Sequence, residues 1–208
     1  MAIRINGTDR QSTINQSSGT PTGTHHLAAN PNLYEVQRVN NFEFIVTDIN
    51  GIMKAGMVGT EKNAKIDNAQ EIIRLSVSST KIPHFKQEPI EVKRGNNTMK
   101  FAGVPTFDAG SIKINDYIGA ASKEVLMAWQ NLSYNVLTEK VGLASDYKKD
   151  CYLVEYTPDY QKVRQWKMHG CWISSLEESE YSHESNEKNQ ITVEIQYDRA
   201  EIDTSEVI

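Results

Sequence analysis

The fold is decided by one hairpin signal, Cys151-Tyr-Leu-Val-Glu-Tyr156 and Val163-Arg-Gln-Trp-Lys-Met168 on the two sides of Thr157-Pro-Asp-Tyr-Gln161. Both outer runs are rich in aromatic and β-branched residues, which are favoured in strands. The Pro-Asp pair between them favours a turn. The segment therefore predicts two antiparallel strands joined by a tight connection, and it indicates architecture and not catalysis.

A cleanly alternating strand follows this hairpin. Ile191, Val193 and Ile195 alternate with polar residues, so one face of the strand is buried and the other meets solvent. Towards the N-terminus, similar signals predict strands over residues 40–48, 72–78, 90–93, 98–101 and 107–115. Gly110 suggests a bulge in the last of these. Arg94-Gly-Asn-Asn97 predicts a hairpin turn, because glycine and asparagine tolerate a positive φ.

One helix interrupts the strands. After Ile118, apolar residues recur at intervals of three and four at Ala121, Val125, Trp129, Leu132 and Val136. This spacing predicts a helix with one apolar stripe. Asp116 is expected as its N-cap and Gly142 lies beyond its end. We expect the helix to close an end or face of the β-core, with Trp129 as its packing anchor.

Two segments stand apart from the β-rich body by composition. Residues 1–37 are dominated by Ser, Thr, Asn and Gly and hold too few apolar residues for a core, so we expect a flexible N-terminal arm, or one that orders on assembly. An unstructured tail without a role is the alternative. The body, residues 38–208, contains an inserted loop at 51–68. We expect that loop to contact a partner.

Composition limits the classes of protein that remain. At 208 residues the chain is long enough for one sizeable β-rich domain with appendages. Its mean hydropathy of -0.53 is typical of a soluble protein. No run approaches transmembrane length, and the first six residues lack the apolar core of a signal peptide. We therefore expect no membrane anchor and a protein that stays where it is made.

Charge and cysteine content exclude two further classes. The net charge is -5 with Lys and Arg dispersed along the chain, so there is no basic stripe for tight nucleic-acid binding. Cys151 and Cys171 are the only cysteines, which argues against a disulfide scaffold and favours a reduced compartment.

No set of residues has the spacing of a specific metal site. Zinc ligands could be drawn from Cys151, His169, Cys171 and His183, but neither cysteine has the close partner that makes a zinc motif specific. We interpret the cysteines as small buried hydrophobes. The pair His25-His26 lies in the arm, where further ligands would have to be recruited at an entropic cost.

The sequence also lacks a specific catalytic arrangement. The segment Leu176 to Glu187 is crowded with glutamates, which is typical of a solvated loop and not of a glycosidase carboxylate pair. Ser182-His183 are adjacent in sequence, but adjacency is not triad geometry. We predict a protein that is not an enzyme, with no catalytic, cofactor-binding or metal residues and no cofactor.

A series of short motifs runs through the body in one order. They are Lys81-Ile-Pro83, Glu91-Val92, Asn97-Thr-Met-Lys-Phe-Ala-Gly103, Thr106-Phe-Asp108, Asn115-Asp116, Trp129-Gln130, Asp146-Tyr-Lys-Lys149, Trp166, Gly170, Trp172 and Ile191 to Asp198. In this order they resemble the tail tube proteins of contractile-tailed bacteriophages, the T4-like tail tube family, which is related to the tube proteins of R-type bacteriocins and type VI secretion. The resemblance spans roughly residues 38–200. The N-terminal arm, the 51–68 loop and the short acidic end Glu201-Ile-Asp-Thr-Ser-Glu206 depart from it.

The resemblance implies a fold and an assembly. The fold would be mainly β (α+β), with two packed antiparallel sheets that form a barrel-like sandwich and one flanking α-helix. The chain would be a structural subunit of the inner tube of a contractile phage tail, in homo-hexameric rings stacked into a conduit for the genome. Sheath, baseplate and tail terminator proteins would be its partners, DNA would pass the lumen without specific binding, and no membrane would be involved. The protein would belong to the virion and be assembled in the host cytoplasm.

Two alternatives remain open at this point. One is a tube protein of a phage-derived injection or secretion machine. The other is a solitary β-barrel that binds a small apolar ligand in its interior, which alternating strands alone would permit.

Overall fold

The computed structural model describes residues 4–5, 8–9, 36–51, 69–118, 121–184 and 186–203. The chain divides into two compact units, Met1–Arg38 and Val39–Ile208. In the first, β1 (Arg4–Ile5) pairs antiparallel with β2 (Thr8–Asp9). The rest of the predicted arm up to residue 35, and the predicted 51–68 loop beyond Gly51, lie outside the described residues. The second unit is called the body below.

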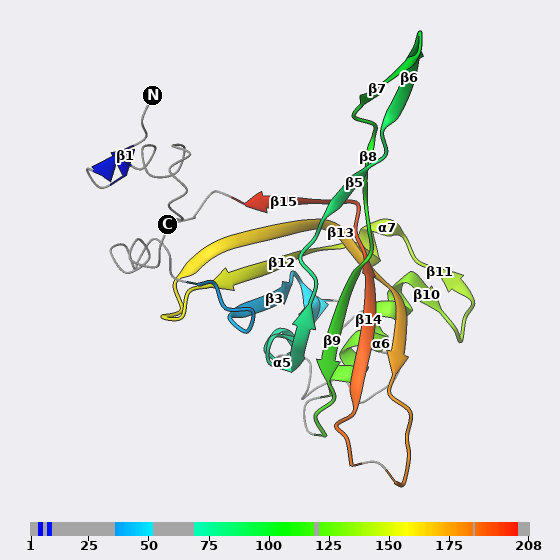
Figure 1. Cartoon of the computed structure of the whole chain (residues 1–208). Helices are drawn as coiled ribbons and strands as arrows, with labels where there is room; N and C mark the ends of the chain where they lie inside the picture. The colour runs from blue at the N-terminus through cyan, green and yellow to red at the C-terminus, as the bar shows by residue number, and fades with distance from the viewer. Residues whose placement is uncertain are drawn as a thin grey trace. The chain divides into compact units, whose positions relative to one another are not determined.

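The body is built on one antiparallel sheet of seven strands (Figure 1). Its hydrogen-bonded order is β3-β12-β13-β14-β9-β4, with β15 on β13 as well. The strands are β3 (Phe42–Val46), β4 (Val77–Thr80), β9 (Gly110–Asn115), β12 (Lys149–Tyr156), β13 (Lys162–Glu178), β14 (Gln190–Gln196) and β15 (Arg199–Asp203). The prediction of a mainly β fold with antiparallel strands is confirmed.

The long strand β13 belongs to two halves of this sheet. Up to Cys171 it pairs with β12 and β15, and from Trp172 it pairs with β14. Gly170 stands at the change, with a φ of +66°, a left-handed conformation that glycine adopts without steric cost. Figure 1 shows the strand changing direction there, from its yellow half to its orange half. The two halves therefore share one continuous strand.

The strands that decided the fold lie where the sequence predicted them. In the hairpin β12–β13, Leu153 is opposite Trp166, and the turn is closed by the Thr157 N–H donating to the Gln161 carbonyl at 2.8 Å. The apolar residues of β14 and the middle of β3 are buried. The predicted bulge at Gly110 is wrong, since Gly110 pairs in register with Ile195 at the start of β9.

Besides the helical residues 49–51, the described part of the chain holds three helices where the sequence predicted one. They are α5 (Ala69–Ser76), α6 (Ser122–Ser133) and the single turn α7 (Ala144–Tyr147). The strand predicted over 72–78 is wrong in its first part, because α5 runs to Ser76 and β4 follows. Ala69, Ile73 and Ser76 are buried on one helical face, whereas Leu75, which a strand would bury with Ile73, is 71% exposed. The buried residues are therefore four and three positions apart, as on one face of a helix, and not two apart as in a strand.

Helix α6 is shorter than its apolar spacing predicts. It begins after Ala121, which is in the left-handed region with a φ of 52° and forms no side-chain cap. Asp116 is therefore not the N-cap, although the Ser122 hydroxyl donates to its carboxylate at 3.4 Å. Ile118 and Val136 lie outside the helix and are exposed.

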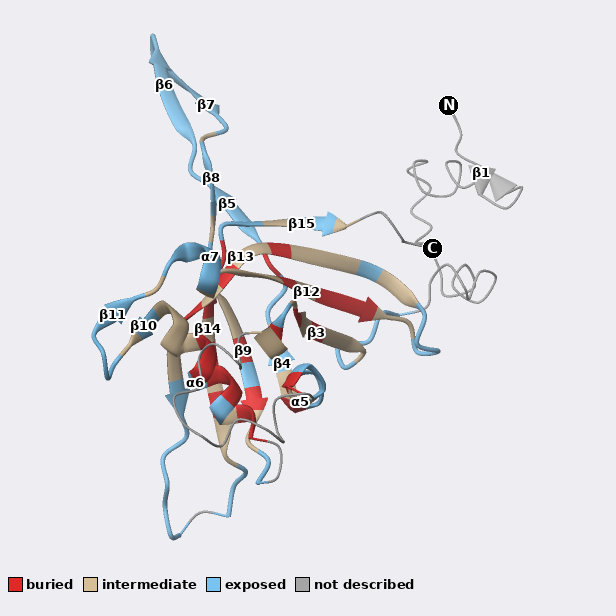
Figure 2. Cartoon of the chain, turned by 180° about the vertical axis from the view of Figure 1, so that it is seen from behind, coloured by how far each residue is buried: buried red, intermediate tan, exposed pale blue. Residues whose placement is uncertain are grey.

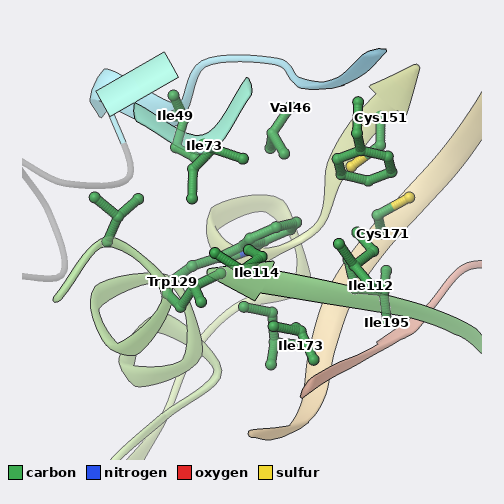
Figure 3. Packing of buried hydrophobic residues seen from close by; sticks show 14 of the residues in the cluster. Val46, Ile49, Ile73, Ile112, Ile114, Trp129, Cys151, Cys171, Ile173 and Ile195 are labelled. Atoms are coloured by element: carbon green, nitrogen blue, oxygen red, sulfur yellow. The ribbon is translucent and has the colours of Figure 1, made fainter. Parts of the chain in front are cut away.

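The core lies between the two halves of the sheet and the helices α5 and α6 (Figure 3). Trp129 is buried in its centre, and its indole Nε1–H donates to the Tyr147 carbonyl at 2.8 Å. The core leaves a gap of about 10 Å³, near the room that one water molecule needs. Among the described residues no ladder joins β3 to β4, the two ends of the strand order, so the sheet is not a closed barrel.

Candidate assembly interface

A long hairpin projects from the body, and we call residues 85–107 the hairpin arm. At its base β5 (Phe85–Gln87) pairs with β8 (Pro105–Phe107), and further out β6 (Ile90–Arg94) pairs with β7 (Asn97–Phe101). Figure 1 shows it as a narrow ribbon leaving the sheet, and Figure 2 shows it almost wholly exposed. The hairpin predicted around residues 94–97 is confirmed, but its exposure was not predicted.

Two glycines make the arm's shape. Gly95 in the turn has a φ of +62°, which suits a two-residue hairpin loop. A side chain at Gly103 would collide with the Glu88 backbone carbonyl. Gly103 therefore lets the two sides of the hairpin come close together at the junction between the β5–β8 pair and the β6–β7 pair.

One face of the outer arm is apolar and uncovered. Ile90 pairs with Phe101, and Val92 pairs with Met99, and these side chains are 46–55% exposed. The other face carries the Glu91–Lys100 ion pair at 3.2 Å. A two-stranded ribbon cannot bury such a face by itself, and a contiguous exposed apolar patch of this kind marks an interaction surface. This face is the strongest candidate interface in the described chain.

The base of the arm is anchored to the sheet by aromatic rings. Phe107 lies with its ring centroid 6.0 Å from Phe85 and 5.8 Å from Tyr197, the residue after β14. Such tilted and edge-on ring pairs contribute about 0.5–1.5 kcal/mol beyond their buried area. Burial raises the pKa of Tyr197. The arm therefore leaves the body at a packed joint.

A second exposed apolar surface follows α6. The short hairpin of β10 (Tyr134–Asn135) and β11 (Lys140–Val141) is held by the Gly142 N–H, which donates to the Ser133 carbonyl at 2.9 Å. Its exposed apolar residues are Tyr134, Val136, Leu137, Val141 and Leu143. Periodicity predicts Val136 on the buried helix stripe, but α6 ends at Ser133 and Val136 is exposed.

The strand β15 forms an edge of the sheet and is tied to it by side chains. His169 on β13 lies between two carboxylates, with Nε2 2.9 Å from Glu201 and Nδ1 3.5 Å from Asp150. The hydrogen bond from His169 is the main cause that lowers the pKa of Glu201. Gln165 Nε2 also donates to Asp203 at 3.0 Å. These contacts are structural ties between neighbouring strands.

The residues weighed for a zinc site do not converge. Cys151 and Cys171 are free and fully buried in the core, His169 is engaged as above, and His183 is exposed. Burial is the main cause that raises the pKa of the Cys151 thiol, followed by its hydrogen bond with Cys171, so the thiolate that binds metal is disfavoured. The described residues contain no group of three His, Cys, Asp or Glu side chains placed to hold a metal ion.

The predicted solvated loop, Leu176 to Glu187, is wrong at its start, because residues 176–178 belong to β13, and it is confirmed from Ser179 on where the structure describes it. Glu177 and Glu178 end β13, and Glu180, Glu184 and Glu187 follow in the exposed connection to β14. In the described segments, no helix is both long and apolar enough to cross a bilayer.

Comparisons with known proteins agree with this architecture. The family of the T4-like virus tail tube protein gp19 matches residues 40–201. A search of curated proteins found no match. Among solved structures, a chain of the PVC sheath-tube complex of an extracellular contractile injection system in the extended state matches with a TM-score of 0.57 and 17% identity, over 88% of this chain and 99% of that one.

Two further structures share the fold. A chain of the anti-feeding prophage cap, the AFP tube terminating cap, matches with a TM-score of 0.55 and 16% identity, over 82% of this chain and 92% of that one. A chain of the PVC sheath/tube terminator in the extended state matches with a TM-score of 0.55 and 18% identity, over 82% and 98%. At such identities these matches show the fold alone.

Proposed function

Because this chain belongs to the T4-like virus tail tube protein family and is thus a tail tube protein of a contractile injection system, we propose that it builds the inner tube of a contractile phage tail. The family is structural and not enzymatic. In the proposed tube, six copies form a ring and the rings stack into a hollow conduit through which the genome passes.

The observation that carries this proposal is the hairpin arm. Its apolar face, with Ile90, Val92, Met99 and Phe101, has no cover among the described residues of its own chain. A subunit of a polymer has that cover supplied by its neighbours, since sheet edges and apolar ribbons that are a hazard in a monomer become joints in an assembly. The arm is the element that we expect to be buried between copies.

We further infer that the two halves of the sheet act as the two packed sheets of a barrel-like sandwich. Phe44 and Leu153 from one half and Ile112 and Val193 from the other belong to one buried cluster. Among the described residues β3, β4 and β15 lie at the edges of this sheet, and we expect them to contact neighbouring subunits around the ring. The cavity described in this core has about 10 Å³, whereas an apolar ligand takes some 300–1,000 Å³.

The proposed tube implies specific partner proteins and a location. We expect the sheath on its outside, and the baseplate and a tail terminator at its ends, in a virion assembled in the host cytoplasm without a membrane. DNA passes the lumen without specific binding, for which a net charge of -5 is favourable, because like charges repel phosphate. The segments 1–37 and 51–68 are proposed to order on neighbouring subunits. A tube of a phage-derived particle is the alternative.

Negative-stain electron microscopy of the concentrated protein tests the proposal. Rings with sixfold symmetry and tubes made from them are expected. Monodisperse monomers that take up an apolar dye would refute it and favour the solitary barrel. Purified particles that contain this tube decide between the two kinds of machine. Particles that also carry packaged DNA are phages, and particles without DNA are phage-derived injection particles.

A further inference from the structure

The outer end of the hairpin arm is cationic. Lys93 and Arg94 are exposed beside the turn, and neither enters an ion pair with any described residue. The nearest opposite charge on the arm, Glu91, is engaged by Lys100 at 3.2 Å. Two uncompensated positive charges therefore stand at the tip of a ribbon that is roughly 30 Å long at about 3.3 Å per residue.

The connection between β13 and β14 is acidic. Between Ser179 and Asn189 it holds Glu180, Glu184, Glu187 and Lys188, a net charge of -2, and Glu177 and Glu178 adjoin it at the end of β13. Asp116 adds to it, since Asn189 Nδ2 donates to the Asp116 carboxylate at 3.2 Å. Glu178 is engaged by Lys123 at 2.7 Å, whereas Glu180 and Glu184 are exposed and enter no ion pair within the described residues.

These two charged regions lie at opposite ends of the body. Figures 1 and 2 both place the tip of β6–β7 at one end and the β13–β14 connection at the other. Each end also exposes apolar or aromatic surface. The arm has its apolar face, and the acidic end has Tyr117, Ile118 and Tyr181. The two ends therefore carry opposite charges, and each also exposes apolar side chains that the other could bury.

We propose that the cationic tip of the hairpin arm in one copy docks against the acidic β13–β14 connection of the copy in the next ring. The inference rests on the proposed tube function and names the two surfaces that join successive rings. The contact is heterologous, so it repeats without closing along one axis. If two subunits met tip to tip or connection to connection, charges of the same sign would repel each other. The charges therefore favour stacking in one direction only.

Charge reversal at either end tests this contact. The tip variant carries Lys93→Glu with Arg94→Glu, and the loop variant carries Glu180→Lys with Glu184→Lys. In the tip variant the tip becomes negative like the connection, and in the loop variant the connection changes from -2 to +2 and becomes positive like the tip. Each is expected to keep the circular dichroism of the parent, because all four side chains are exposed. The critical concentration for sedimentable tubes should rise by about tenfold or more in each.

Two rescues separate this contact from a general effect of charge. The quadruple variant has the net charge of the parent, and it should sediment as tubes at nearly the parent's critical concentration. An equimolar mixture of the tip and loop variants should co-sediment, because each supplies the end that the other lacks. Raising the salt concentration from about 0.1 M to about 1 M, which shortens the Debye length from about 10 Å to about 3 Å, should raise the critical concentration of the parent.

The outcomes also separate this inference from the proposed function. A parent protein that forms no tubes under any condition would refute the proposed function itself. If the parent forms tubes and both double variants do so equally well, only the docking of tip on connection is overturned. The same conclusion holds if the double variants fail and neither the quadruple variant nor the mixture restores tubes.

Discussion

Gly170 is required by the change of direction in β13. Its φ of +66° is one that other residues adopt at a cost of about 1–2 kcal/mol. An added Cβ would also meet the Asp198 carboxylate, which Lys148 holds at 2.8 Å. We expect Gly170→Ala to lower the free energy of unfolding by about 2–3 kcal/mol, measured by urea denaturation.

Gly95 provides the matched control for that substitution. Its φ of +62° is nearly the same, but an added Cβ there has no neighbour within 4 Å. Gly95→Ala should therefore cost only the backbone strain, about 1 kcal/mol. Equal losses in the two variants would show that Asp198 moves aside freely and that the crowding at the bend has no energetic weight.

Trp129 is predicted to stabilise the core by packing and by one hydrogen bond. Trp129→Ala should cost about 3–5 kcal/mol, which approaches the whole stability of a small domain. Trp129→Phe keeps most of the ring but leaves the Tyr147 carbonyl without its donor, at about 1 kcal/mol.

Met127 lies on the same helix and is 46% exposed, against 2% for Trp129. Met127→Ala should change the free energy of unfolding by less than about 0.5 kcal/mol. Similar losses for Trp129→Ala and Met127→Ala in thermal denaturation would contradict the assignment of Trp129 as the anchor of α6.

Individual core residues were predictable wherever the periodicity was unambiguous. Val193 and Ile195 alternate with polar neighbours and are buried, and Trp129 stands at helical spacing and is buried. Ile118 and Val136 continue the same helical spacing and are nevertheless exposed. Spacing fixes which face a residue takes inside an element but not where the element ends, and here the left-handed Ala121 starts α6 later than the pattern predicts.

At the scale of elements, the hairpin arm is expected to act in assembly and not in folding. Ile90→Ser with Phe101→Ser removes one of the two cross-strand pairs of its apolar face, and neither side chain is in the core cluster. The double variant should keep the parent's melting temperature to within a few degrees and form sedimentable tubes only at a critical concentration about tenfold higher or more.

The opposite face of the arm supplies the control. Glu91→Ser with Lys100→Ser changes as many residues on the same strands but removes only an exposed ion pair, worth about 0–1 kcal/mol. This variant should assemble far better than the Ile90 and Phe101 variant. Loss of folding in the latter would show instead that the arm contributes to the stability of the body.

Segment 72–78 shows where element prediction fails and why. Ile73, Leu75 and Val77 alternate as in a strand, yet Ile73 also stands at helical spacing from Ala69 and Ser76. Short apolar runs do not distinguish the two periods, so tertiary contacts decide. Here Arg74 on α5 reaches Glu43 of β3, with Nε 2.8 Å from Oε1. The same glutamate accepts a hydrogen bond from Tyr156 at 3.0 Å.

The candidate interface was only half visible in the sequence. Alternation in 90–93 and 98–101 predicted the paired strands, which are confirmed. A strand whose apolar face is buried in its own core shows the same alternation as a strand whose apolar face is buried against another subunit. Which of the two applies depends on whether any part of the same chain covers the apolar face, and only the three-dimensional structure answers that.

At the scale of the whole molecule, the segment 51–68 is predicted to serve assembly and not the fold. Its replacement by a short Gly-Ser linker should leave a folded body, because the strands of the main sheet and the described core residues lie outside it. Circular dichroism should stay unchanged while sedimentation shows fewer or shorter tubes. Loss of the β signal, or tubes as long as those of the parent, would contradict this role.

The strand ladder between β3 and β12 has a consequence for synthesis. Asn41 donates a hydrogen bond to Thr157, 116 residues away along the chain, so β3 leaves the ribosome long before the strand it pairs with. At translation rates of about 5–20 residues per second, the delay is on the order of ten seconds. During that time each nascent chain presents Phe42, Phe44 and Val46 without their ladder. Neighbouring ribosomes on one messenger then hold such strands close together. The yield of soluble subunit should therefore depend on the rate of initiation and on chaperones that cover the emerging N-terminal half.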